Sequence, residues 1–252
     1  MTLVYLVLAV IFFEWSALDS LVQNYFYNAE TLTWMIDRNE PILHFLLYSG
    51  IKKLFIAIVL FLLFALIFLR KNDWVKHNVK GLVIVVLSCL IIPLTVGALK
   101  DNTNMPCPNQ LVEFGGQYDS IGLFETLGAD SQRPITRCYP AGHASGGFAL
   151  LSLLFLFRTK KSRNNALIGV MLLGWSTASY KILIGDHFLS HTIVTMLLAW
   201  IIVLLINSWV SYIESRFFNK LIITDKLPIK TKSDYNGPII LYVDSINNYE
   251  NI

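Results

Sequence analysis

Three of the five histidines in this chain, together with a lysine, fall in two short patterns that could do chemistry. Residues 140–143 read Pro-Ala-Gly-His, and some forty positions later Lys181 is followed by His187 and His191. Each pattern borders a long apolar run, which places ionisable side chains at the ends of hydrophobic helices. An ionisable group is costly in such a place, so a functional site is the first hypothesis.

These side chains suit the binding and transfer of a phosphate group. Lys181, and Lys100 at the end of an earlier apolar run, would neutralise charge on the non-bridging oxygens. One histidine would attack phosphorus and another would protonate the leaving oxygen, which requires no metal or other cofactor. The backbone amides of Gly142, His143 and Ala144 are expected at a helix N-terminus, which favours anions. The sequence therefore predicts a phosphate site built from several helix ends.

The spacing of His187 and His191 indicates how one of them could be activated. Side chains four residues apart on a helix project from the same side, so the two rings could form a hydrogen bond. His191 would then accept the proton on the far ring nitrogen of His187 and leave the near nitrogen as a free lone pair. Gly185, just before the pair, is expected to form a tight turn between two helices.

Plainer interpretations of these residues stay open. A single histidine or lysine at a membrane interface is most often a snorkelling or capping residue. The Gly146-Gly147 pair most often only permits close helix packing. A histidine pair at this spacing could also bind zinc, but zinc needs further ligands, and hydrolysis would need a carboxylate base such as Asp186. The joint spacing of the residues favours the phosphate site.

The elements that must position these residues are membrane helices. The chain has 252 residues, of which 55% are hydrophobic and 15% charged, a balance that soluble domains rarely carry. A membrane span needs about 17 to 25 residues. We therefore predict an all-α integral membrane protein with six transmembrane helices, from apolar runs at 2–18, 54–69, 81–99, 144–157, 166–184 and 188–207.

Basic residues indicate the orientation of these helices. Short cytoplasmic loops collect lysine and arginine, and such clusters occur at 70–80 and 158–163. The loop 100–143 has no basic excess, so we expect it to face outward and both termini to be cytoplasmic. The net charge of +3 is then a topology signal that implies no nucleic-acid partner. The first run could instead be a signal peptide, but no basic residue precedes it and no cleavage site follows.

We expect one membrane domain over 1–215 and a cytoplasmic tail over 216–252. The segment 20–53 would be an outer connection in which 41–51 forms a short helix along the membrane interface. The tail contains turn signals, so it could hold a hairpin or be disordered.

The three cysteines are of two kinds. Cys89 lies inside an apolar run, where a cysteine usually packs as a small hydrophobe. Cys107 and Cys138 fall in the loop expected outside, where disulfides persist. A bridge between them would stabilise the loop by roughly 3 kcal/mol. Two unrelated free thiols are the alternative.

Over residues 80–207 this arrangement resembles the type 2 phosphatidic acid phosphatase superfamily, six-helix membrane enzymes that share a fold with vanadium haloperoxidases. The family pattern is Lys-x6-Arg-Pro, then Pro-Ser-Gly-His, then Ser-Arg-x5-His-x3-Asp. Here Lys100 begins the first motif, residues 140–143 are the second, and Lys181, His187 and His191 form the third. The order and internal spacing of the motifs match.

The resemblance implies a role for each matched residue. His187 would form a phosphohistidine, His143 would be the general acid, and His191 would orient His187. Lys100 and Lys181 would hold phosphate, and Ala141 and Gly142 would also belong to the phosphate-binding site.

Four positions depart from the family pattern. Cys107 and Lys181 replace arginines, Ala141 replaces a serine, and His191 replaces an aspartate. A lysine at 181 keeps the charge but loses the bidentate fork of arginine. The charge missing at Cys107 could come from another position of the same loop, Arg137 or Arg133.

These features predict a membrane lipid phosphatase whose substrate is a lipid phosphate, such as lipid A, undecaprenyl diphosphate or a glycerophospholipid phosphate. A bacterial inner membrane, with the site facing the periplasm, is the expected location. Two alternatives are a lipid phosphotransferase that uses the same intermediate and a catalytically silent membrane protein that binds lipid phosphate. A haloperoxidase is disfavoured because those relatives are typically soluble and retain the arginines.

Overall fold

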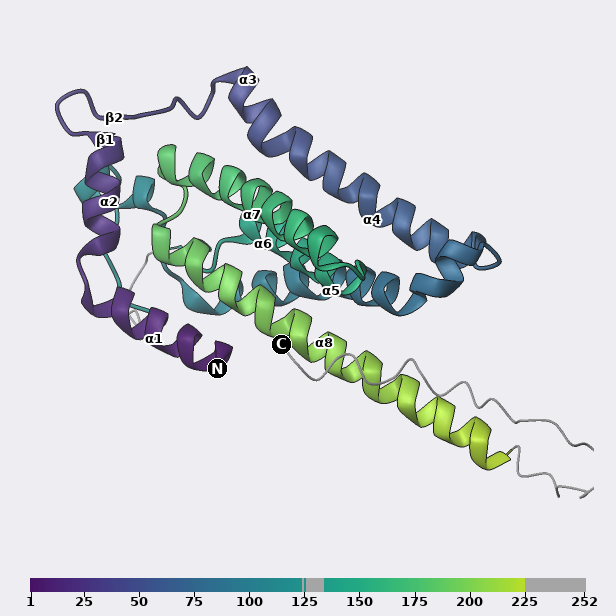
Figure 1. The fold of residues 1–252 in the computed structure, drawn as a ribbon. Helices are drawn as coiled ribbons and strands as arrows, with labels where there is room; N and C mark the ends of the chain where they lie inside the picture. The colour runs from purple at the N-terminus through teal and green to yellow at the C-terminus, as the bar shows by residue number, and fades with distance from the viewer. Residues whose placement is uncertain (124, 126–133, 225–252) are drawn as a thin grey trace, which may run out of the picture. The chain divides into compact units, whose positions relative to one another are not determined.

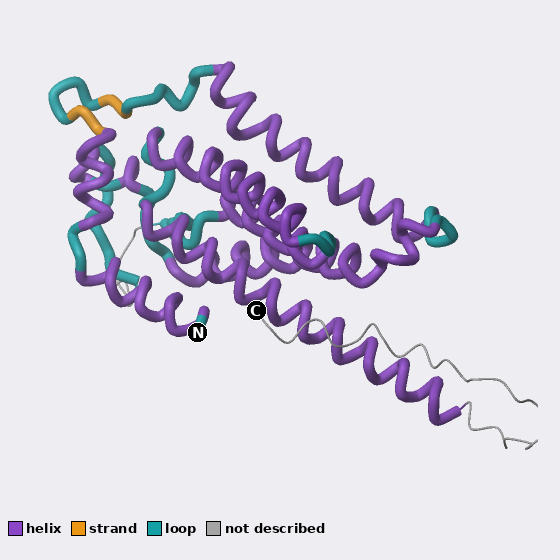
Figure 2. The backbone as a smooth tube through the Cα atoms, viewed as in Figure 1, coloured by secondary structure: helices purple, strands orange, loops and turns teal. Residues whose placement is uncertain are grey.

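The computed structural model describes residues 1–123, 125 and 134–224, without the side chains of 217–224. Helices make up most of this part of the chain, and its strands are limited to one short pair (Figure 2). The compact unit Met1–Ile213 holds every predicted site residue. Arg133 and most of the predicted tail lie outside the described residues, as do the turn signals within that tail.

Eight α-helices are ordered along the described chain (Figure 1). They are α1 (Thr2–Trp15), α2 (Leu18–Phe26), α3 (Pro41–His44), α4 (Gly50–Phe68), α5 (Asp73–Thr103), α6 (Gly142–Ala149), α7 (Lys160–Leu183) and α8 (Leu189–Thr224). The strands β1 (Tyr27–Asn28) and β2 (Thr33–Trp34) pair antiparallel after α2. Shorter helical turns are η1 (Phe45–Ser49), η2 (Pro108–Gln110), η3 (Val112–Phe114) and η4 (Leu150–Phe155).

Four of these helical segments are long and apolar enough to cross a membrane, as expected of a membrane protein. They are Pro41–Phe68, Asp73–Gln110, Lys160–Leu183 and Leu189–Arg216. A fifth span is possible only if α1 and α2 count together, because the chain bends by 68° between them. The prediction of six spans is therefore not confirmed, although the predicted runs are helical.

The prediction of a separate interfacial helix at 41–51 is wrong in one respect. Instead of ending before the second span, α3 continues through the π-turn η1 into α4, so that Pro41–Phe68 is one apolar segment. Pro41 begins the helix at a position that needs no N–H donor, and the Glu40 side chain accepts the N–H of Leu43. This extension brings Tyr48 to the end of the helix bundle that holds the predicted site residues.

The fourth predicted span is too short to cross a bilayer by itself. Its helix covers Gly142–Phe155 and changes from α to 3-10 geometry at Leu150. It packs instead against two longer helices. A Cβ atom added to Gly147 would lie 2.9 Å from the Cα of Gly174 in α7, and one added to Gly81 of α5 would lie 2.7 Å from the carbonyl oxygen of Phe155. Glycine is required at these contacts because the neighbouring atoms belong to the backbone.

A single core joins α4, α5, α6, α7 and α8. It includes Leu82 and Ile92 of α5, Phe148 of α6, and Val203 of α8, all fully buried. Cys89 is free and buried in the same cluster, where it packs as a small apolar residue. This core fixes the ends of the helices relative to one another, and those ends carry the predicted site.

A second, smaller cluster covers one end of the bundle. Tyr27, Leu111, Phe114 and Phe188 are buried there, with Trp34 packed against them. Trp34 lies directly over Gly185, whose φ of 72° is the left-handed turn conformation predicted for this glycine. Segments that are distant in sequence therefore cover the turn between α7 and α8.

Candidate active site

The structure places the five predicted ionisable residues at neighbouring helix ends. Lys100 lies in the last turn of α5, and Lys181 in the last turn of α7. His143 is the second residue of α6, and His191 is in the first turn of α8. His187 precedes α8 by two residues, in the turn that follows Gly185. The site residues therefore come from the ends of α5, α6, α7 and α8, and the packing of these four helices brings them together.

His143 and His187 face each other across the site. Their ring centroids are 6.0 Å apart. The Nε2 atom of His143 is 3.2 Å from the hydroxyl oxygen of Tyr48, and the ammonium group of Lys181 lies 4.1 Å from the centre of the Tyr48 ring. Sequence reasoning missed Tyr48, because a tyrosine within an apolar helix resembles an interfacial aromatic residue. Tyr48 connects the two motifs through side-chain contacts.

The ammonium group of Lys100, which belongs to α5, lies at the N-terminus of α6. A Cβ atom at Gly142 would be 3.2 Å from the Nζ atom of Lys100, so the absence of a side chain gives the ammonium group its place. The helix begins at Gly142 after Ala141, whose own N–H is used by Thr195 Oγ1 at 2.8 Å. The helix N-terminus and a lysine thus present positive charge at one spot, as an oxyanion site requires.

The predicted hydrogen bond between His187 and His191 does not form. The ring centroids are 5.7 Å apart with planes inclined at 60°, and neither His191 nitrogen has a hydrogen-bond partner among the described residues. The backbone of Cys138 is a polar neighbour of the His191 ring. The prediction assumed that both histidines are helical. Because α8 begins only at Leu189, the i, i+4 relation does not apply.

The predicted disulfide forms, and it, rather than His191, lies beside Nδ1 of His187. Cys107 and Cys138 are bonded, with Cα atoms 5.2 Å apart, and the Sγ of Cys138 lies 3.5 Å from Nδ1 of His187. A disulfide sulfur is only a weak acceptor. If the ring proton is on Nδ1 and points towards this sulfur, the free lone pair is on Nε2. Burial, followed by the charges of His191, Lys100 and other neighbours, lowers the pKa of His187 well below its usual value, which favours this neutral ring.

Cys138, His187 and His191 also form the one group in the described residues whose donor atoms are close enough for a metal ion, within 4.8 Å of one another. Their chemistry does not fit a metal. Cys138 is in a disulfide and offers no thiolate, so only two histidines remain, fewer than the three protein ligands of a catalytic zinc site.

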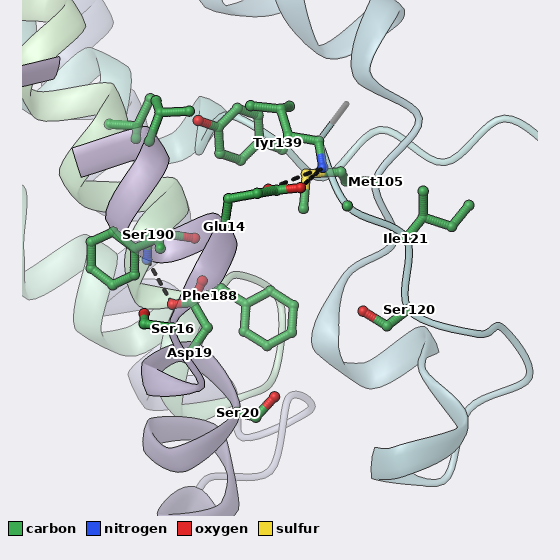
Figure 3. A pocket seen from close by; sticks show the side chains of 15 residues that line it. Glu14, Ser16, Asp19, Ser20, Met105, Ser120, Ile121, Tyr139, Phe188 and Ser190 are labelled. Carbon is green, nitrogen blue, oxygen red and sulfur yellow. Dashed lines mark hydrogen bonds between the residues drawn. The ribbon is translucent and has the colours of Figure 1, made fainter. Parts of the chain in front are cut away.

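Helix α2 supports the turn that carries His187 (Figure 3). The fully buried Gln23 donates its Nε2–H to the carbonyl oxygen of His187 at 2.8 Å. One turn earlier, the Asp19 carboxylate accepts the backbone N–H of Ser190 at 2.9 Å, and so caps the first turn of α8. A cavity of about 160 Å³ adjoins this contact and is bordered by Glu14 and Tyr139. Sequence reasoning missed α2 because a helix cap from a distant segment leaves no local pattern.

Asp186 joins the site to the connection between β2 and α3. Its carboxylate pairs with Lys181 at 2.8 Å, with the guanidinium of Arg38, and with the side-chain amide of Asn109 at 3.0 Å. The sequence gives no signal for Arg38, which stands alone between the polar residues Asp37 and Asn39.

Arg137 does not take part in this cluster. Its guanidinium pairs with Asp101 at 3.2 Å, and the side chain is 64% exposed. The replacement of the missing arginine by Arg137 stays a prediction that this arrangement does not support, because Asp101 holds its charge at the surface.

An apolar cavity of about 360 Å³ opens beside His143 and Lys181. Its remaining walls come mainly from α4, α6 and α7, and they include Leu47, Ile51, Phe55, Ile56 and Leu173. Lys52 lies at the same cavity. The site thus has a charged end and an apolar extension, a combination suited to an amphiphile with an anionic head group.

A family model described as the PAP2 superfamily matches residues 81–215, more than half of the chain. Searches of curated proteins and of solved structures find no match. The matched region contains Lys100, His143, Lys181, His187 and His191. Members of this superfamily are generally phosphatases. The chain, with its histidines and lysines gathered at one end of apolar helices, therefore belongs to the PAP2 superfamily.

Proposed function

We propose that this protein is a lipid phosphate phosphatase that works through a phosphohistidine intermediate at the periplasmic face of a bacterial inner membrane. The observation that carries the proposal is that His143, which faces His187, lines an apolar cavity together with Lys181. Phosphatase chemistry accounts for the charged end, and a lipid chain accounts for the apolar walls.

In the first step, Nε2 of His187 attacks phosphorus while the bond to the lipid oxygen breaks. His143 donates a proton to the leaving oxygen. Desolvation by the surrounding residues and the charges of Lys181 and Lys100 lower the pKa of His143, whose side chain is still accessible to a ligand, so a proton on this ring needs an anion beside it. A bound phosphate is such an anion. In the second step, His143 takes a proton from water, the water oxygen attacks phosphorus, and the bond to His187 breaks.

The lysines have complementary roles in this scheme. Lys100, at the N-terminus of α6, neutralises oxygens of the phosphoryl group as charge moves in the transition state. Lys181 is almost fully buried against Tyr48 and Asp186, so its ammonium group has a fixed position. A preorganised charge of this kind stabilises the transition state without reorganisation.

The apolar cavity favours a lipid over a soluble phosphate ester. The candidate substrates are lipid A, undecaprenyl diphosphate and glycerophospholipid phosphates, which share a phosphate head and long apolar chains. A chain lying along α4 would leave the head group beside His143.

The test is release of inorganic phosphate from a panel of these lipids by the detergent-purified wild type and by His187→Ala and His143→Ala. We expect release by the wild type and a loss of at least about a thousandfold in the His187 variant, because the covalent step is removed. With a labelled lipid phosphate and unlabelled acceptor lipids, a newly labelled lipid in place of free phosphate would identify a transferase. No product from any lipid, with no effect of His187→Ala in cells, would identify a silent binding protein.

A further inference from the structure

Two cationic side chains share the single carboxylate of Asp186. Lys181 and Arg38 both pair with it directly. The third side-chain partner of Asp186 is the neutral amide of Asn109. One carboxylate thus offsets only one of the two positive charges that it holds, which leaves positive charge for an anionic ligand.

Arg38 and Lys181 differ in their access to a ligand. The Lys181 side chain is 8% exposed, whereas the Arg38 side chain is 54% exposed. Arg38 belongs to the connection between β2 and α3, as the residue four positions after Trp34, which covers Gly185. An incoming oxyanion can therefore reach Arg38 from solvent, while Asp186 keeps the guanidinium at the edge of the site.

We propose that Arg38 is a phosphate-binding residue, which supplies from the outer connection the guanidinium that the chain lacks at Cys107. The inference rests on the proposed function, in that the ligand is taken to be a phosphate group. Asp186 holds Arg38 and Lys181 in the resting site, and a phosphate oxygen replaces it as the partner of the Arg38 guanidinium. A planar guanidinium suits this role because it donates two parallel hydrogen bonds to phosphate.

The experiment measures inorganic phosphate binding by Arg38→Gln, Arg38→Lys and Arg163→Gln in detergent. Arg163 is a matched exposed arginine whose side chain bonds to the carbonyl oxygen of Phe157. Two readouts are used: the inhibition constant of phosphate during lipid hydrolysis, and the rise of the unfolding midpoint with phosphate concentration. We expect Arg38→Gln to weaken phosphate binding by roughly tenfold or more, Arg38→Lys to restore part of the loss, and Arg163→Gln to resemble the wild type.

Asp186→Asn separates binding from a merely structural role of Arg38. This variant breaks the same ion pair but leaves the guanidinium available, so phosphate binding should be as tight as in the wild type or tighter. The proposal is overturned if Asp186→Asn and Arg38→Gln weaken phosphate binding equally, since Arg38 would then act only by holding Asp186. It is also overturned if Arg38→Gln has no effect, or if Arg137→Gln is the arginine change that weakens binding.

The two proposals fail in different ways. If the wild type hydrolyses no lipid phosphate, the proposed function fails, but the midpoint shift with inorganic phosphate still tests Arg38. If the wild type hydrolyses lipid and Arg38→Gln binds phosphate normally, only the inference about Arg38 fails.

Discussion

At the scale of single residues, the site depends on which histidine is free to react. His187 is buried between a disulfide sulfur on its Nδ1 side and the ring of His143 6.0 Å away. Burial and neighbouring positive charge both oppose protonation of the ring, which lowers the pKa of His187. A carboxylate partner would act in the opposite direction, so a histidine in place of aspartate at position 191 favours a neutral His187 ring.

The lowered pKa of His187 predicts that its ring stays neutral as pH falls through 6.5, the ordinary value. Protonation, and the loss of the nucleophilic lone pair, should occur only at lower pH. The measurement is an NMR titration of isotope-labelled histidines in detergent, in which His187→Ala identifies the signal. A signal that titrates at or above pH 6.5 would contradict the burial argument.

His191→Phe tests whether His191 orients the nucleophile. Both His191 nitrogens are buried without a partner in the described chain, and the ring packs edge-on against Tyr139 at 5.0 Å between centroids. An apolar ring removes the cost of two buried, unpaired polar atoms, about 1–3 kcal/mol for each group. We expect the variant to be at least as stable as the wild type and to retain phosphate release. A large fall in kcat with unchanged stability would restore the orienting role.

At the scale of elements, α2 holds the turn between α7 and α8 although it lies more than 150 residues away in sequence. Gln23 fixes the His187 carbonyl and Asp19 caps α8, so a short N-terminal helix sets the backbone position of His187. The bend of 68° after α1 gives α2 its separate direction.

Gln23→Met keeps the side-chain volume but removes the donor to the His187 carbonyl. The unpaired carbonyl should lower the free energy of unfolding by about 1–3 kcal/mol. Displacement of the nucleophile should lower kcat more than it changes KM. The neighbouring exposed Asn24→Ala, which loses only a bond of 3.3 Å to Glu113, is the control in thermal unfolding and kinetics. Equal behaviour of the two variants would show that α2 does not position His187.

Two glycines of α5 should respond to alanine with opposite signs. A Cβ atom at Gly81 would meet the backbone of Phe155 and Leu156 at 2.7 and 2.8 Å, whereas one at Gly97 would have nothing within 4 Å. We expect Gly81→Ala to lower the free energy of unfolding by about 1–3 kcal/mol through overpacking. Gly97→Ala should stabilise the helix by up to about 1 kcal/mol. Unfolding midpoints in detergent measure both, and a stabilising Gly81→Ala would show that α5 and η4 do not pack this closely.

At the scale of the whole unit, the Cys107–Cys138 disulfide joins the segment after α5 to the segment before α6. It closes a loop with a sequence separation of 31 and touches His187, so the stability of the bundle end and the geometry of the site depend on the same bond. The aromatic cover formed by Tyr27, Phe114 and Phe188 packs over the same end.

Removal of this bond should lower both stability and activity. We expect the free energy of unfolding of Cys107→Ser/Cys138→Ser to fall by about 2–4 kcal/mol, because the unfolded chain is no longer constrained. The double variant should also release phosphate more slowly. A reductant should have the same effect on the wild type and none on the double variant. Because the double variant keeps the free thiol of Cys89, it controls for effects at that residue. Unfolding midpoints and initial rates are the measurements. An unchanged midpoint in the double variant would exclude a bracing role.

The sequence by itself determined the class of protein and the principal chemical groups. Apolar runs identify membrane helices because a bilayer permits few alternatives, and motif spacing places Lys100, His143 and His187 near helix ends. These predictions depend on local pattern. The boundaries were less accurate: a helix start at Leu189 in place of His187 was enough to remove the predicted histidine pair.

Only the tertiary structure decided which groups surround the predicted site residues. Tyr48, Gln23 and Arg38 come from the N-terminal third of the chain, and none stands in a pattern that indicates its partner. Their contacts form because η1 and α2 pack against α7, and because Trp34 covers Gly185. Contacts between distant segments depend on the packing of the whole unit, whereas helix formation and motif spacing depend on neighbours along the chain.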